Sequence, residues 1–524
     1  MNLDTVPPEE VSYSLVLNST FLMLGIIAGR VMGYLRDLLV TSIYGKSYHT
    51  DAYMVALTFP LLLYALLTGG VVTSSFVPVL SREKGKNFEI LSNTFFLGLL
   101  LTGGILTLLS ILFASALVLI LAPFMSPEGR ELTIYLLRIA SIGILPLIGA
   151  GGFMATLHCR GDFRAPSLSG LLFNGFVVLT IFLGASLLGI VSTSWGLVLG
   201  SLSTWLFLGW MLRALRHDFS SGLNFRHPGI RKVVILSIPV ILGLAIYQIN
   251  PIIEKAIASL IGEGAITVVG VASRIIQLPY ALFGLAISTV LLPTLSKSAA
   301  EEDFLSLKKN LSWGVAAASF FLLPSAVGIF QLSYPVVRLL FEWGEFSHEA
   351  ALVTALVLKI YSLGVWGHGV NSVFIRAFYS LQEPRIPTLL GAFTILVQAV
   401  LYYVFAKIWG IPGLALGSSL GAYLLLALLI VFLRPRLKGL GMSVRSEELL
   451  KIAFSSLIMG VFLFLLSPYL TFGLETIPLK LRLLEVLGNV SAGAVIYLFV
   501  NYLLKSEILR QYILILKRPF YDKG

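Results

Sequence analysis

The sequence predicts an all-α integral membrane protein with about fourteen transmembrane helices, and three observations support that prediction. Hydrophobic residues make up 57% of the 524 residues and charged residues only 12%, which is more apolar surface than a soluble core can bury. Apolar runs recur along the whole chain, and each is long enough to cross roughly 30 Å of hydrocarbon as a helix. These runs are too long and too uniform for the short alternating strands of a membrane barrel.

Each apolar run predicts one crossing of the membrane. The N-terminal segment has no positively charged region before its apolar core, so the first run is expected to stay in place as an anchor. The approximate limits are 13–42, 51–79, 91–122, 132–158, 167–189, 192–214, 233–261, 264–296, 311–341, 350–379, 387–409 and 411–433, followed by 449–471 and 481–504.

Lysine and arginine gather in the loops that follow even-numbered spans, as at Arg160, Arg213 and Arg385. The loops that follow odd-numbered spans contain almost no Lys or Arg, and some are acidic, as around Glu342. Because basic loops stay on the cytoplasmic side, we expect both termini of this multi-pass membrane protein in the cytoplasm. This bias and anionic membrane lipids account for the net charge of +11, so no nucleic-acid partner is needed.

Three short sequence echoes predict that the chain contains two related halves. Pro78 corresponds to Pro293 at a shift of 215, GLVLGS at 196–201 to GLALGS at 413–418, and FRAPSLSG at 163–170 to PRIPTLLG at 384–391. Each half contains an even number of crossings, so the copies share one orientation and a substrate cleft is expected between them. The predicted organisation is a six-helix lobe over 1–215, a second over 216–435, and two C-terminal helices with a basic cytoplasmic tail over 436–524.

Arg30, Arg36 and Arg274 fall inside or at the edge of spans. A guanidinium keeps its charge, and holding it at bilayer depth costs at least about 2.5 kcal/mol, so an anionic ligand is the expected partner. Snorkelling to the interface is the alternative, and it suits Arg36 better than the deeper Arg30. Residues six apart on a straight helix point about 240° apart, so Arg30 and Arg36 converge only if a bend forms, for which Gly33 offers a place.

Acidic residues accompany these cations. Asp37 adjoins Arg36, and Asp51 can either cap the helix that begins near it or hold an arginine in place. Glu254 and Lys255 are adjacent, point about 100° apart on a helix, and are expected to have separate partners. A single cysteine, Cys159, and scattered histidines predict no metal site, and no phosphate-binding loop motif for a nucleotide is present.

Several segments resemble the MurJ/MviN family of lipid II flippases in the MOP exporter superfamily. They are GRVMGYLRDLLV at 29–40, TDAYMVALTFP at 50–60, SSFVPVLSREKG at 74–85, ASRIIQLPYALFGLAISTVLLPTLSKS at 272–298, LPSAVGIF at 323–330, FEWGEF at 341–346 and AFYSLQEPRIPT at 377–388. The resemblance covers nearly the whole chain, and the segment at 272–298 is its most specific part.

This resemblance implies two six-helix lobes around a cationic cavity for the diphosphate and sugars of lipid II, the undecaprenyl-linked precursor of peptidoglycan. The polyprenyl tail would lie in a groove formed by spans thirteen and fourteen. Arg30, Arg36 and Arg274 match the cavity arginines of the family, and Asp37 and Asp51 match their acidic partners. The expected activity is transfer of lipid II to the outer leaflet by alternating access, without enzyme chemistry or a cofactor, for cell-wall biogenesis and in contact with the cell-wall synthesis machinery.

The chain departs from the family pattern in the second span. PLLLYALLTGGV at 60–71 places Tyr64 where an arginine is usual and Gly69 where a glutamate is usual, although Tyr64 can still donate a hydrogen bond to phosphate. Glu254 matches a carboxylate linked to sodium in some relatives, but its acidic companion is absent and Gln398 is the nearest polar residue. Sodium and the membrane potential both remain open as driving forces.

Two other functions remain as alternatives. One is an exporter of another polyprenyl-diphosphate-linked saccharide or of a small molecule in the same superfamily. The other is a polyprenyl-diphosphate glycosyltransferase or polymerase with Asp37 or Asp51 as the base. The short outer loops leave little room for an acceptor-binding domain, which favours transport over this enzyme class.

Overall fold

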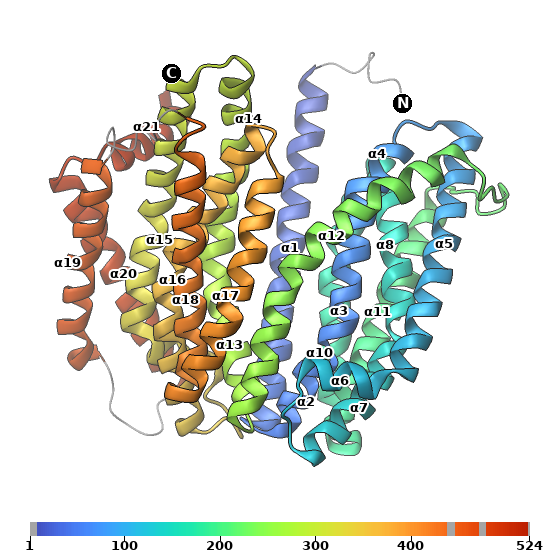
Figure 1. The fold of residues 1–524 in the computed structure, drawn as a ribbon, viewed down its shortest axis with the longest axis horizontal. Helices are drawn as coiled ribbons and strands as arrows, with labels where there is room; N and C mark the ends of the chain where they lie inside the picture. The colour runs from blue at the N-terminus through green and yellow to red at the C-terminus, as the bar shows by residue number, and fades with distance from the viewer. Residues whose placement is uncertain (1–7, 438–445, 471–477, 522–524) are drawn as a thin grey trace. The chain divides into compact units, whose positions relative to one another are not determined.

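The computed structural model describes residues 8–437, 446–470 and 478–521, and every element within them is a helix (Figure 1). Thirteen of these helical segments are long and apolar enough to cross a membrane, from Tyr48–Leu80 to Leu479–Leu503. The helix α1, Pro8–Tyr44, covers the first predicted span as well. The predicted all-α membrane fold is therefore confirmed, with a number of crossings close to the one expected. Part of the predicted C-terminal segment, 438–445, 471–477 and 522–524, lies outside the described residues.

The chain divides into two compact units, residues 1–264 and 265–524. The first contains α1 Pro8–Tyr44, α2 Tyr48–Ala56, α3 Thr58–Tyr64, η2 Ala65–Phe76, α4 Val77–Leu80, α5 Gly85–Leu112, α6 Ala114–Leu121, α7 Pro127–Ile142, α8 Ile144–Cys159, α9 Arg164–Ser167, α10 Ser169–Leu188, α11 Val191–Ala214 and α12 Pro228–Ile261. The second contains α13 Ala265–Pro279, η3 Tyr280–Leu285, α14 Ala286–Ala300, α15 Phe304–Phe341, α16 His348–Ser380, α17 Arg385–Trp409, α18 Ile411–Leu433, α19 Ser446–Leu470, α20 Leu479–Leu503 and α21 Glu507–Tyr521.

The long helix α12 belongs by its contacts to the first unit. It packs on η2, where a Cβ built at Gly70 would lie 2.7 Å from Leu244 Cδ1. The sequence echoes instead assign this span to the second half of the repeat. The predicted lobe limits at 215 and 435 stay a prediction, since they describe ancestry of the sequence and the compact units describe present contacts.

Local sequence explains where several helices begin. The Ser126 hydroxyl accepts a hydrogen bond from Gly129 N at 3.3 Å, with Pro127 at the first helical position of α7. Asp303 Oδ1 accepts from Leu305 N at 3.1 Å and from Ser306 N at 3.0 Å, which caps α15. Such caps satisfy backbone N–H groups that a helix leaves without partners.

Two spans contain a π-helical stretch at matching places. The second span passes through η2, which begins at Ala65, and the eighth passes through η3, which begins at Tyr280. These starting points are 215 residues apart, the same shift that relates Pro78 to Pro293. Because π-helical turns are rare, their recurrence at one offset agrees with the duplication predicted from the sequence.

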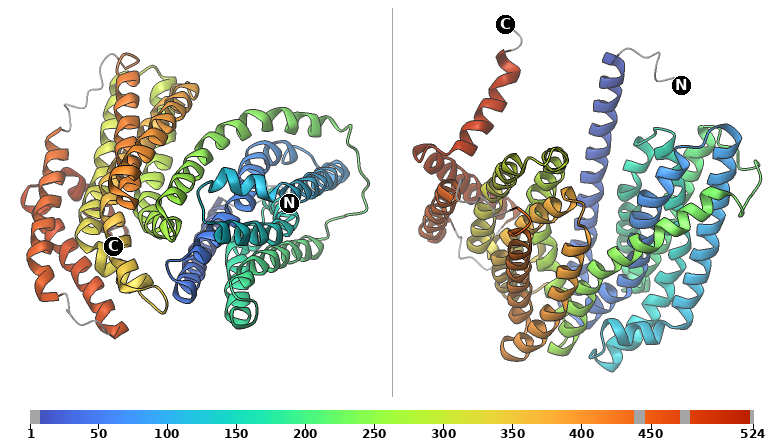
Figure 2. Two further views of the ribbon diagram at one scale, coloured as in Figure 1. Left: turned by 60° about the horizontal axis from the view of Figure 1, so that its bottom comes forward. Right: turned by 45° about the horizontal axis from the view of Figure 1, so that its top comes forward.

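The second unit ends in α21, which leaves the end of α20 at an angle (Figure 2). Ile508 and Leu509 are buried, and Tyr512 stacks on Phe320 with ring centroids 5.9 Å apart. A carboxylate from another helix caps its start, because Glu448 Oε1 accepts from Ile508 N at 3.2 Å and also from the Ser506 hydroxyl. The described part of the tail is therefore anchored on the second unit.

Candidate functional site

The helix α1, which carries Arg30 and Arg36, packs closely on α9 and α10. A Cβ built at Gly25 would lie 2.5 Å from Ser167 O, and one at Gly29 would lie 3.0 Å from the carbonyl carbon of Gly170. Gly33 continues this stripe and faces Asn174. Small residues four apart let helix backbones approach closely in a membrane, so Gly33, predicted as the place for a bend, instead belongs to a packing stripe on an unbroken helix.

Arg36 is held inside the first unit. It is 6% exposed and Asp37 is 1% exposed. Arg36 Nε and Nη2 each lie 3.1 Å from Asp37 Oδ1, and Nη1 donates to Asn174 Oδ1 at 3.0 Å. The snorkelling alternative would leave this guanidinium at a lipid interface, whereas the structure surrounds it with an anion and an amide. Such pairing offsets the cost of burying the charge.

Arg30 is exposed, although it lies on the same helix as the buried Arg36. The helix α1 runs unbroken from Pro8 to Tyr44, including Gly33 (Figure 1). The opposite exposure of the two arginines agrees with the rotation of about 240° expected for residues six apart. Their convergence on a single ligand stays a prediction.

Asp51 is 3% exposed and lies in the first turn of α2, whose N-cap position belongs to Ser47. Its Oδ2 accepts a hydrogen bond from Gly264 N at 2.6 Å. This carboxylate therefore fixes the end of the loop after α12 and does not occupy the cap position, which corrects one of its two predicted roles. The backbone at Gly264 has φ +76°, a conformation that favours glycine.

Glu254 and Lys255 are half-buried on α12, and Lys255 has a partner of its own, as expected. Its Nζ donates to Thr58 Oγ1 at 2.6 Å and to Met54 O at 3.2 Å. These acceptors lie where α2 ends and α3 begins, so the ammonium binds carbonyl and hydroxyl oxygens at a break in the second span.

Tyr64 is the last residue of α3 and directly precedes η2. It is half-buried, and Gly69 within η2 is exposed with open space where a Cβ would be. Arg274 lies in the second unit, half-buried on α13, five residues before the proline that precedes η3. The departures from the family pattern thus lie at and within η2, and the third candidate arginine lies on the helix that leads into η3.

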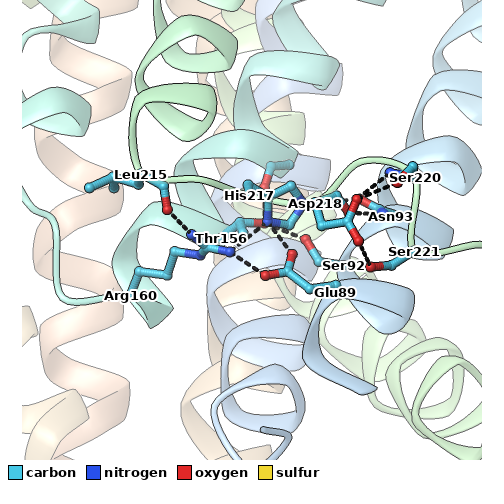
Figure 3. A network of polar contacts seen from close by, with 11 residues as sticks. Glu89, Ser92, Asn93, Thr156, Arg160, Leu215, His217, Asp218, Ser220 and Ser221 are labelled. Atoms are coloured by element: carbon cyan, nitrogen blue, oxygen red, sulfur yellow. Dashed lines mark hydrogen bonds and ion pairs between the residues drawn. The ribbon is translucent and has the colours of Figure 1, made fainter. Parts of the chain in front are cut away.

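A polar network that the sequence interpretation missed lies at the start of α5, the end of α8 and the loop after α11 (Figure 3). Arg160 Nη1 donates to Leu215 O at 2.7 Å, and Nη2 is paired with Glu89. His217 Nε2 lies 2.9 Å from Asn93 Oδ1, and its Nδ1 lies 3.0 Å from Arg160 Nη2 and 2.5 Å from Glu89 Oε2.

Titration in this network follows from burial and neighbouring charge. Burial, followed by the Arg160 cation, lowers the pKa of His217 to about 4, so the ring is neutral near pH 7. Asn93 Nδ2 donates to Asp218 O at 2.8 Å, which leaves Asn93 Oδ1 to accept from His217 Nε2–H. The hydroxyls of Ser220 and Ser221 lower the pKa of Asp218 to about 2. The network attaches the loop after α11 to α5 and α8.

Comparison with known proteins identifies the family. The family model described as lipid II flippase MurJ matches residues 40–482. The lipid II flippase MurJ of Burkholderia cenocepacia is 28% identical over 422 residues, covering 78% of this chain and 82% of that protein. The probable lipid II flippase MurJ of Thermotoga maritima is 26% identical over 498 residues, covering 93% of this chain and 96% of that protein.

Solved structures agree with this assignment. A lipid II flippase MurJ in an inward closed conformation superposes with a TM-score of 0.77 at 25% identity, covering 93% of this chain and 98% of that one. An inward-facing multidrug resistance transporter of the MATE family, in the MOP superfamily, superposes with a TM-score of 0.67 at 17% identity, over 79% of this chain and 96% of that one; it shows a shared fold only. Because the family model extends from within α1 to α20, this protein belongs to the lipid II flippase MurJ family.

Proposed function

We infer that this protein is a flippase that moves lipid II from the cytoplasmic to the outer leaflet of the bacterial inner membrane. The observation that carries this conclusion is the family match over residues 40–482, together with a fold that covers 98% of a solved lipid II flippase. The protein is accordingly a transporter, and peptidoglycan synthesis is the process it serves. Within the described residues, thirteen helices are long and apolar enough to cross a membrane, which agrees with a multi-pass membrane protein.

The head group of lipid II would be recognised by permanent cations. Arg30 is exposed, Arg36 is buried against Asp37, and Arg274 is half-buried, so the three offer different degrees of contact with a diphosphate. Arginine suits this ligand because its planar fork of donors matches phosphate oxygens. Tyr64 would add a neutral hydroxyl donor, a weaker contact than the arginine usual at this position.

Transport would follow alternating access. The cationic residues bind the diphosphate from the cytoplasmic leaflet, a conformational change exposes the head group to the other side, and the ligand is released there. The step needs no covalent chemistry. The distribution of Lys and Arg among the loops supports cytoplasmic termini, and membrane lipids and the cell-wall synthesis machinery are the proposed further partners.

Energy could come from sodium, through Glu254 on α12, or from the membrane potential, which is worth roughly 2.3 kcal/mol per charge at 100 mV. The neighbouring Lys255 already supplies a fixed cation to the oxygens at the break between α2 and α3. This favours the membrane potential, because a built-in ammonium adds positive charge beside the carboxylate that would attract sodium.

Complementation of a bacterium depleted of its own lipid II flippase tests the proposal. Wild-type protein should restore growth, whereas Arg30→Ala and Arg274→Ala should not. Arg226→Ala, which removes an exposed loop arginine outside the site, is the matched control and should restore growth fully. Failure of the wild-type protein, at normal membrane levels, would instead favour an exporter of a different polyprenyl-diphosphate saccharide and direct attention to Tyr64 and Gly69.

A further inference from the structure

Asn174, in the second turn of the apolar helix α10, contacts α1 at two separated points. Its Oδ1 accepts from Arg36 Nη1 at 3.0 Å. Its Nδ2 donates to Gly29 O at 3.2 Å and, within its own helix, to Gly170 O at 3.0 Å. One side chain thus bonds to the guanidinium of Arg36 and to the backbone carbonyl of Gly29, which directly precedes the other candidate arginine, Arg30.

The orientation of this amide is determined by its surroundings. A carbonyl oxygen can only accept, and two carbonyls face Nδ2, so Nδ2 must be the amino group and both of its N–H donors are used. The amide oxygen therefore points at Arg36, which can only donate. Both sides of the amide are matched to their partners, and rotating it by 180° would break all three hydrogen bonds.

Glycine makes this contact possible. The position of a Cβ at Gly33 lies 3.7 Å from Asn174 Nδ2, so the amide rests over the bare backbone of α1 between Gly29 and Arg36. Gly29 meets Gly170 at a distance that leaves no room for a side chain. A side chain at Gly29 would press on the backbone of Gly170 and move α10 away, which would separate the amide from the arginine, whereas a Cβ at Gly33 would meet the amide at an ordinary contact distance.

Asp37 and Asn174 hold Arg36 in complementary ways. Asp37 binds Nε and Nη2 with one oxygen, and it balances the charge. Asn174 binds Nη1, at the other end of the guanidinium fork, and it is anchored in turn on α1 and α10. Contacts with Asp37 at one edge of the fork and with Asn174 at the other therefore orient the guanidinium plane from both sides.

We propose that Asn174 is a positioning residue for substrate binding: anchored on the carbonyl of Gly29, it fixes the guanidinium plane of Arg36. This inference rests on the proposed function, because it takes Arg36 to recognise a diphosphate. Recognition of phosphate by a planar fork depends on orientation as well as charge, so loss of the amide would weaken binding while every arginine remains present.

A double-mutant cycle tests this role with purified full-length protein in lipid nanodiscs and lipid II as the probe. Asn174→Ala should weaken lipid II binding about tenfold, the loss expected for a hydrogen bond to a charged group. In an Arg36→Ala background the same change should have no further effect on binding, since Asn174 would act through Arg36. Asn174→Leu, which fills the space of the amide, repeats the cycle in case the smaller side chain disturbs packing.

Asn371→Leu is the matched control. Asn371 is a buried amide that joins α16 to α18 through Ala422 O at 2.9 Å, so its loss removes a helix-to-helix hydrogen bond of the same kind. The melting temperature of Asn371→Leu should fall as that of Asn174→Ala does, but its lipid II affinity should stay within about twofold of wild type. Losses that simply add in the double variant, or unchanged affinity in Asn174→Ala, would overturn the positioning role. Wild-type protein that binds no lipid II would instead overturn the proposed function and this inference with it.

Discussion

The Lys255 ammonium is bound to the Thr58 hydroxyl at 2.6 Å, where the second span breaks between α2 and α3. Thr58 Oγ1 in turn donates to Met54 O at 2.8 Å, and Lys255 reaches the same carbonyl at 3.2 Å. A helix end carries partial negative charge on its free carbonyls, so a cation is stabilised there. The lysine thus connects α12 to Met54 and Thr58 on the two sides of this break.

Removing that cation should loosen α12. Lys255→Met keeps most of the apolar stem and loses both hydrogen bonds, so we expect a loss of about 1.5–3 kcal/mol in stability, as for hydrogen bonds to charged groups. The melting temperature of the purified protein measures this. Lys309→Met, at an exposed position on α15, should leave it unchanged. Equal melting temperatures for both variants would show that the ammonium contributes nothing at the break.

The approach of α1 to α10 should not tolerate a side chain at Gly29. Gly29→Val places a branched Cβ against the backbone of Gly170, and overpacking of this kind costs about 1–3 kcal/mol. Gly104→Val, on α5 with nothing within 4 Å of the Cβ position, makes the same chemical change in open space. Thermal unfolding should separate the two variants by at least several degrees, with Gly104→Val close to wild type.

Stability should fall in mild acid because of His217. Its folded-state pKa is about 4 against an ordinary value of 6.5, so the unfolded chain takes up the proton first. The folded state is therefore favoured by its neutral His217, fully above about pH 6.5 and less and less as the pH falls toward about 4. We expect the free energy of unfolding to fall by about 1–2 kcal/mol over this range, because the nearby Glu89 carboxylate partly stabilises the protonated ring. As the pH is lowered from 7 to 4, the melting temperature of His217→Gln should fall less steeply than that of the wild type. An equal slope for both proteins would contradict the lowered pKa of His217.

The start of α21 should depend on Glu448. Glu448→Ala removes the carboxylate that accepts from Ile508 N and the Ser506 hydroxyl, and loss of a helix cap costs about 1–2 kcal/mol. Amide hydrogen exchange over residues 507–512 should therefore become faster. Glu447→Ala, which removes the exposed neighbour paired with Lys451, should leave exchange in this segment as it is in the wild type.

The sequence was sufficient for the fold class because span length and hydropathy are local properties of the chain. It also drew attention to Arg36, since a permanent charge in an apolar run is conspicuous. Its partner Asn174 was missed because the two residues are 138 positions apart and a single amide in a membrane helix is unremarkable. The available signal was the spacing of Gly25, Gly29 and Gly33, which predicts a close helix neighbour but does not say which helix supplies it.

The network at His217 was missed for a different reason. Its members come from two helices and a loop, and each of them alone is typical of a polar residue near a membrane surface. The role of Asp51 was half predicted: its position at the start of a helix was correct, but Ser47 stands at the N-cap position and the Asp51 carboxylate accepts from Gly264 N instead. Because Gly264 is 213 positions away in the sequence, only the path of the backbone brings the two together.

The paired π-helical stretches η2 and η3 have a mechanical consequence. A π turn holds about one residue more than an α turn, so tightening one such turn into α geometry would rotate the part of the helix beyond it by about 100°. Residues next to the stretch, such as Tyr64 before η2, would then swing to a new side of a helix that stays continuous and fully hydrogen-bonded. Since each half carries this spare residue at the same place, both halves have an equivalent means of turning part of a membrane helix without breaking it.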